Sequence, residues 1–151
     1  MVKARDKRAA SAATTESLGF LLAKASARWN ERLARAFSQR GFADVRPAWG
    51  SVLLPLYEED GLRMGELAQR SRLAKQTLTT LVPQLERAGL IVRERDPDDA
   101  RAWRVRLTER GRELETVADG VLRDLDASVA EHLTREATEE LRRALRGVME
   151  L

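Results

Sequence analysis

Cysteine is absent from this 151-residue chain, and histidine, aromatic residues and long apolar runs are scarce. Without cysteine there is no disulfide framework, thiolate metal site or thiol redox switch. The longest apolar run, Val52 to Tyr57, is far too short to cross a bilayer, and no apolar core follows the charged N-terminus as a secretory signal requires. We therefore expect a single-domain, soluble cytoplasmic protein with no membrane partner.

Catalytic and metal-binding patterns are also missing. The single histidine, His132, has no cysteine and no nearby set of acidic ligands, so we expect no metal and no cofactor. No Ser-His-Asp set, glycine-rich phosphate loop or pair of buried carboxylates stands out. The sequence therefore does not predict an enzyme.

Charge is unevenly distributed along the chain. Residues 62–107 carry ten basic and six acidic side chains, whereas residues 108–151 carry seven basic and eleven acidic ones. A basic middle section beside an acidic end places the expected anion-binding face in residues 62–107, although uneven scatter of surface charge gives the same numbers.

The middle section changes its apolar period twice. A helical pattern from Ala74 to Ala88 stops at Gly89, and two alternating segments, 90–95 and 103–107, flank the polar turn 96–101. These patterns predict a helix followed by a β-hairpin. A short helix at 65–70 and a tight connection at 71–73 complete a helix-turn-helix, and residues 62–64 are expected to add a short strand to the hairpin. The predicted architecture is mainly α with a small β-hairpin wing.

Long amphipathic helices flank this section. Thr14 or Thr15 is expected to cap a helix that ends at Gly41, and Thr108 a helix that reaches about His132; Thr134 caps the last one. We predict a winged helix-turn-helix lobe at 46–107 and a helical dimerisation region at 14–45 and 108–151. The alternative is that the flanking helices complete the core of a monomer. Residues 1–13 are expected to form a flexible basic arm.

Several short motifs in this order resemble the MarR (multiple antibiotic resistance regulator) family. They are the strand start Gly89-Leu90-Ile91-Val92-Arg93, the turn Asp99-Ala100-Arg101, and the helix start Leu107-Thr108-Glu109-Arg110-Gly111. The resemblance spans about residues 14–151. It implies a homodimeric winged helix-turn-helix transcriptional regulator that binds double-stranded DNA and is often released by a small phenolic ligand. We expect a repressor on a pseudo-palindromic operator.

Two residues depart from the family pattern. The helix predicted at 74–88 is the one expected to read DNA, and we call it the reading helix. Pro83 stands in it where a polar helix former is usual, and Ala74 stands at its start where Ser or Asp is commoner. Because proline lacks an amide hydrogen and clashes with the preceding turn, we expect a bend between the first and second halves of this helix.

The predicted DNA contacts lie on the reading helix and the wing. Lys75, Gln76, Thr77, Thr79 and Thr80 form the outer edge of the helix; Gln76 suits adenine and Lys75 suits guanine or phosphate. The alternative is an ordinary solvated face. By the family resemblance, Arg101 reaches the minor groove while Asp99 steadies it or the turn. We expect phosphate contacts for three other arginines, Arg72, Arg95 and Arg104. For Arg93 and Arg106, packing or ion pairs are equally open.

Four aromatic residues of the first two helices are candidates for an effector pocket, namely Phe20, Trp29, Trp49 and Tyr57. The resemblance implies that the family's ligand cleft lies here, beside the DNA-binding lobe. The alternative is that they are core residues. Two rival functions remain open: a constitutive regulator with a filled cleft, and a winged helix that binds proteins.

Overall fold

The computed structural model describes residues 15–150, so the predicted arm at 1–13 lies outside the described residues. The fold is mainly α with a small three-stranded sheet, as predicted. Its elements in chain order are α2 (Leu18–Gln39), η1 (Pro47–Trp49), α3 (Gly50–Glu58), β1 (Leu62–Arg63), α4 (Met64–Ser71), α5 (Lys75–Arg87), β2 (Ile91–Arg95), β3 (Trp103–Leu107), α6 (Glu109–His132) and α7 (Arg135–Met149).

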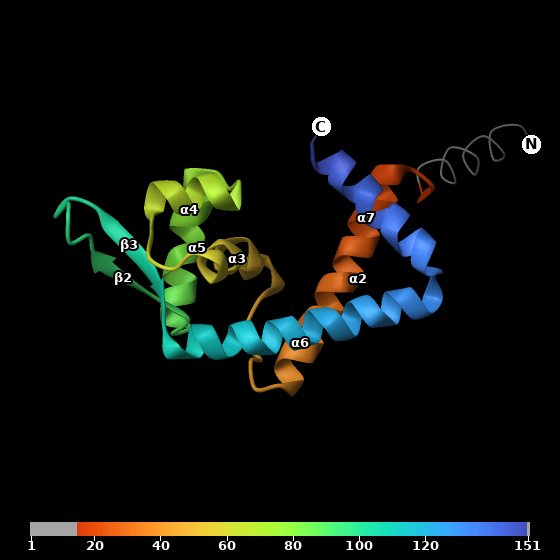
Figure 1. Ribbon diagram of the computed structural model, residues 1–151, viewed down its shortest axis with the longest axis horizontal. Coiled ribbons are helices and arrows are strands. Elements are labelled where there is room, and N and C mark those ends of the chain that lie inside the picture. Colours follow the sequence, from red (N-terminus) through yellow and green to blue (C-terminus); the bar gives the residue numbers. More distant parts are fainter. Residues whose placement is uncertain (1–14, 151) are drawn as a thin grey trace, which may run out of the picture.

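The elements form two groups joined by one long helix (Figure 1). Helices α3, α4 and α5 and the β2–β3 hairpin gather at one end, with the hairpin projecting away from the helices. Helix α2 begins beside α7 at the other end and then crosses α6, and α6 runs from the hairpin to α7. The division into a DNA-binding lobe at 46–107 and a dimerisation region at 14–45 and 108–151 stays a prediction.

The sheet has the order β1-β3-β2, and both pairings are antiparallel. Leu62 pairs with Val105, so the predicted short strand before α4 does join the hairpin, with Met64 already in the helix. Val92 pairs with Arg106, and Arg95 with Trp103. Since side chains alternate across a strand, Ile91, Val105 and Leu107 share one face, and they are buried in the core.

Glycine ends two helices, as predicted. Gly41 and Gly89 have φ values of +88° and +68°, which few other residues adopt. After each glycine the next amide turns back to the helix: Phe42 N–H donates to the Phe37 carbonyl at 2.9 Å, and Leu90 N–H donates to the Leu85 carbonyl at 3.0 Å. These bonds satisfy carbonyls at the helix ends and turn the chain sharply.

One apolar core joins the central lobe to α6. Its fully buried residues come from the lobe helices, the sheet, the connection between α5 and β2, and α6 as far as its middle. They include Val52, Leu56, Leu67, Leu78, Leu85, Leu90, Val105, Leu114 and Val121. Burying one such leucine or valine contributes about 1.5–3 kcal/mol. The reading helix is therefore fixed to the same core as the long helix.

Two predicted details of the helices need revision. Helix α2 starts at Leu18 and is capped by the hydroxyl of Ser17, because that oxygen accepts a hydrogen bond from the Phe20 amide at 3.3 Å. It is not capped by Thr15, and Thr14 lies outside the described residues. Helix α5 runs through Pro83 without interruption. A bend there stays a prediction.

A candidate DNA-binding surface and an adjoining cavity

Helices α4 and α5 form a helix-turn-helix with a tight connection. Arg72 ends α4 in the left-handed conformation, at φ +53°. Helix α5 then begins at Lys75, and Ala74 before it offers no side-chain acceptor for the first amides. Those amides and the positive end of the helix dipole therefore stay available to an external anion such as phosphate.

The outer edge of α5 carries the five predicted polar residues. Lys75, Gln76, Thr77, Thr79 and Thr80 are all exposed, whereas the opposite side of the helix is buried through Leu78, Val82 and Leu85. The hydroxyls of Thr79 and Thr80 donate back to the carbonyls of Lys75 and Gln76, at 2.8 and 3.1 Å. Their methyl groups are thus better placed than their hydroxyl hydrogens to meet an outside partner.

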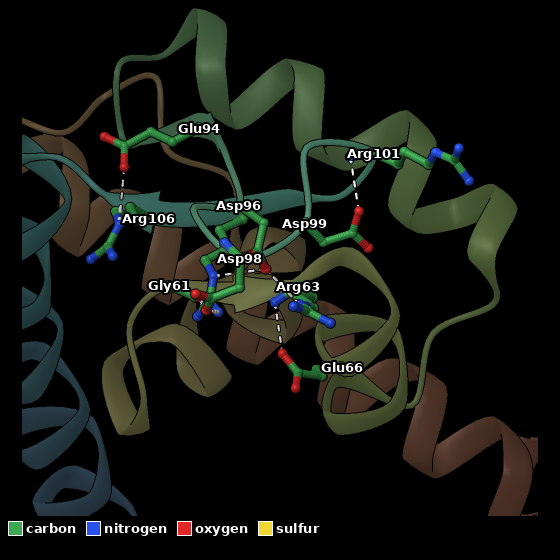
Figure 2. Close-up of polar contacts among 10 residues, drawn as sticks. Gly61, Arg63, Glu66, Glu94, Asp96, Asp98, Asp99, Arg101 and Arg106 are labelled. Carbon is green, nitrogen blue, oxygen red and sulfur yellow. Dashed lines mark hydrogen bonds and ion pairs between the residues drawn. The ribbon is translucent and has the colours of Figure 1, made fainter.

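The turn of the wing carries one exposed arginine side chain, that of Arg101. The Asp99 carboxylate accepts a hydrogen bond from the Arg101 amide at 3.0 Å, so Asp99 fixes the turn. Figure 2 shows the Arg101 side chain extending away from this bond. Its guanidinium has no carboxylate within 4 Å in residues 15–150, which leaves the charge free to bind a partner.

Asp96, directly after β2, is a buried carboxylate around which the contacts between β1, the turn and β3 meet (Figure 2). One of its oxygens accepts hydrogen bonds from Arg63 Nε at 2.6 Å and from Arg104 Nε at 3.0 Å, and its side chain is 0% exposed. These contacts, the Arg63 bond foremost, hold the pKa of the Asp96 carboxyl well below its usual range. Because Arg63 also donates its amide to Glu66, the carboxylate links the wing to the start of α4.

Sequence reasoning missed Asp96 and gave Arg104 the wrong surroundings. We expected Arg104 to contact phosphate, but its guanidinium binds Asp96 and the Gly61 carbonyl, the latter at 3.3 Å. It is therefore a residue that positions the hairpin. The alternation of residues 103–107 was the one sequence signal for the side on which Arg104 lies. No local pattern shows that Arg63 and Arg104 meet at Asp96.

The other arginines of the lobe have distinct surroundings. Arg93 pairs with Glu86 at 2.9 Å and Arg106 with Glu94 at 3.0 Å, which decides the alternatives for both in favour of ion pairs. Arg72 is exposed and lies 3.6 Å from Glu150, a solvated pair of small energy. Arg95 stacks on Trp103, with 4.1 Å between its guanidinium carbon and the ring centroid.

A cavity of about 230 Å³ lies between the lobe and the flanking helices. Two of the four predicted aromatic residues, Trp29 and Tyr57, line it, together with Arg46 and apolar residues of α2, α3 and α6. The Tyr57 hydroxyl is buried and has no hydrogen-bond partner among the described residues. Burial, and then the nearby Glu115 and Asp119, raise the pKa of Tyr57, so it is a neutral donor.

The structure does not bring the other two aromatic residues to this cavity. Trp49 is only 5% exposed and packs in the core, where its indole nitrogen is 3.4 Å from the Gln84 side-chain oxygen. Phe20 lies near the start of α2, outside the cavity, with the Lys24 ammonium 5.6 Å from its ring. The core alternative therefore holds for Trp49, and the predicted set of four is wrong as a single site.

Residues 15–150 contain neither a metal-binding cluster nor a membrane-spanning helix. No group of three His, Cys, Asp or Glu side chains there could hold a metal ion. None of the helices in that range has the length and apolar character needed to span a bilayer.

A helix-turn-helix with an exposed polar edge, beside a hairpin whose tip carries an exposed arginine, defines a winged helix-turn-helix transcriptional regulator. The MarR family model matches residues 48–103. The chain is 31% identical to the HTH-type transcriptional repressor Rv2887 of Mycobacterium tuberculosis, over 85% of this chain and 90% of that protein. The chain belongs to the MarR family.

Solved structures agree with this membership. The transcriptional repressor CouR, bound to a 23-mer DNA duplex, is 28% identical with a TM-score of 0.77, covering 91% of this chain and 95% of CouR. Rv2887 in complex with salicylic acid is 30% identical with a TM-score of 0.62, covering 87% of this chain and 96% of that one.

Proposed function

We propose that the chain acts as a homodimeric repressor whose hold on a pseudo-palindromic DNA site is relieved by a small aromatic acid. The observation that carries the proposal is the presence of two exposed polar elements in one lobe, the outer edge of α5 with Lys75 and the turn with Arg101. The DNA complex of CouR and the salicylic acid complex of Rv2887 support the two halves of the proposal by similarity.

Each lobe would place the first half of α5 in a major groove. There Gln76 can bond adenine and Lys75 a guanine or a phosphate, while the methyl groups of Thr79 and Thr80 can meet thymine. Arg101 would enter the neighbouring minor groove, where narrow A·T-rich segments concentrate negative potential. Two such lobes would sit one helical turn apart, about 34 Å.

The helices outside the lobe supply the argument for two copies. Within residues 15–150, α7 buries only Thr138, and its apolar stripe of Leu141, Leu145, Val148 and Met149 is 37% to 70% exposed. The start of α2 exposes Leu18 and Leu21 as well. Apolar surface of this extent favours a second copy of the chain as its cover, because the two-fold symmetry of an operator requires two lobes.

The cavity beneath the lobe is where we place the effector. Its walls are apolar, Arg46 can pair with a carboxylate, and the Tyr57 hydroxyl needs an acceptor. Because α3 and α6 both line it, a ligand there would change how the lobe sits on the long helix. A benzoate-sized acid matches this chemistry.

The DNA half of the proposal is tested by binding to duplexes selected from a randomised library. Gln76→Ala should relax the base preference at its position, with a cost of about 1–3 kcal/mol on the preferred duplex. Arg101→Ala should weaken binding and lower its salt dependence. Arg123→Ala, an exposed arginine of α6, is the matched control and should change neither property. Binding that is insensitive to both lobe variants would contradict the placement. Weak dependence on salt would favour a protein-binding module.

A further inference from the structure

Trp103 is an unusual residue to find uncovered on the wing. It is 40% exposed, although it lies on the same face of β3 as the buried Val105 and Leu107. The hairpin therefore extends past the edge of the core, and Trp103 lies on the part that the core does not cover. Its indole N–H makes no hydrogen bond to any residue between 15 and 150.

Arg95 is held against this ring at two points. Its register partner is Trp103, and its guanidinium carbon lies 4.1 Å from the ring centroid. Its Nη1 also donates to the Ala100 carbonyl at 2.9 Å, immediately before Arg101 in the turn. The stacking and this hydrogen bond already restrict the Arg95 rotamer, so binding a partner costs less side-chain entropy.

The charge of Arg95 is left without an acidic partner. Arg93 and Arg106 of the same hairpin pair with Glu86 and Glu94, whereas Arg95 has no carboxylate within 4 Å in the described part of the chain. Arg95 and Arg101 are therefore two unpaired cations of one turn, and an apolar ring lies beside the first.

We propose that Trp103 and Arg95 form a second wing contact with DNA, in which Arg95 binds a backbone phosphate and Trp103 packs on the adjoining deoxyribose. The inference rests on the proposed DNA binding and extends it to a part of the wing outside the Arg101 turn. A backbone contact of this kind positions the wing and reads no base directly.

Duplex DNA fits this surface better than a protein partner. Trp103 is a single exposed ring beside a cation. The other large apolar side chain exposed on the hairpin, Val92, lies on the opposite face with Arg106. Protein-binding surfaces are larger contiguous apolar patches. One ring next to a fixed guanidinium matches a sugar and its phosphate.

Affinity for a fluorescein-labelled duplex, selected from a random library with the unmodified protein, tests the proposal. Trp103→Ala should weaken binding about tenfold, as losing one good contact does, and Trp103→Phe should recover most of that loss. Arg95→Gln should lower the slope of log K against log salt by about one. Val92→Ala removes an equally exposed apolar side chain from the other face and should bind normally.

Acrylamide quenching of tryptophan fluorescence gives a second readout that uses the unmodified chain. Trp49 is buried and Trp29 is only partly exposed, so Trp103 is the most exposed of the three tryptophans, and its share of the quenchable signal should become shielded when the duplex binds. The shielding should vanish in Trp103→Phe. Unchanged quenching on DNA binding, or normal affinity of Trp103→Ala, would overturn this inference and leave the proposed function intact. Failure of the library to yield any bound duplex would overturn both.

Discussion

The substitution Gly111→Ala should destabilise the protein, although it replaces glycine with the best helix former. Gly111 lies in the first turn of α6, and a Cβ built on it would be 2.2 Å from the Leu90 carbonyl oxygen and 3.2 Å from Leu107 Cδ2. The obstacle is backbone, so no side chain can rotate away. The chain must shift where the hairpin meets the helix.

The size of the effect follows from the contacts that this shift disturbs. Overpacking costs about 1–3 kcal/mol. The Leu90 carbonyl also accepts the Thr108 amide at 3.1 Å, and weakening that bond adds about 1 kcal/mol. Alanine returns about 1 kcal/mol of helix propensity. A net loss of about 2 kcal/mol corresponds to a Tm lower by ~4–8 °C in a chain of this length.

Gly120→Ala is the matched control, because Gly120 lies in the same helix and its Cβ would meet nothing within 4 Å. It should raise stability by about 0.5–1 kcal/mol. Urea unfolding monitored by circular dichroism compares the two variants. A Gly111→Ala protein as stable as the Gly120→Ala protein would refute the argument from close approach.

Three further predictions concern the wing, the cavity and the flanking helices. Asp96→Asn should lower stability and DNA affinity at pH 7. Since the native pKa of Asp96 is depressed, its contribution is fully present above the ordinary carboxyl pKa near 3.9 and is lost only as pH falls through the lower native pKa, so the gap between the two proteins in urea unfolding should narrow steadily as pH is lowered below about 4. Tyr57→Phe removes a buried hydroxyl without a partner, so thermal unfolding should show equal or higher stability but a smaller shift with salicylate; an unchanged shift would exclude Tyr57 as a ligand contact. Leu145→Asp should turn a dimer into monomers in sedimentation velocity, whereas Arg143→Asp, two residues away on the other side of α7, should not; dimers in both variants would contradict the proposed interface.

The fold could be predicted from the sequence because its signals are local. Gly41 and Gly89 end helices, Thr108 and Thr134 cap them, and the change of period around residues 90–107 marks the hairpin. Each of these features depends on residues a few positions apart. The start of α2 was misplaced because Thr15 and Ser17 are equally suitable caps by residue type, and packing decides between them.

The site was harder to predict because its contacts are distant in sequence. The exposed edge of α5 follows from helical spacing, so the exposure of its five polar residues could be predicted, while their contacts with DNA stay a prediction. Arg63 and Asp96 are 33 residues apart, and their meeting depends on β1 pairing with β3. For the same reason Arg104 was mistaken for a free cation, and spacing alone could not show that Trp49 points into the core while Trp29 and Tyr57 line a cavity.

Hydroxyl-radical footprinting on a library-selected duplex tests whether a dimer binds DNA through α5 and the wing. We expect two protected half-sites whose centres lie about 10 base pairs apart, with minor-groove protection on the outer flanks that disappears in Arg101→Ala while the central protection remains. A single unpaired footprint, or flank protection that survives loss of Arg101, would contradict a dimer that reads DNA with α5 and the wing.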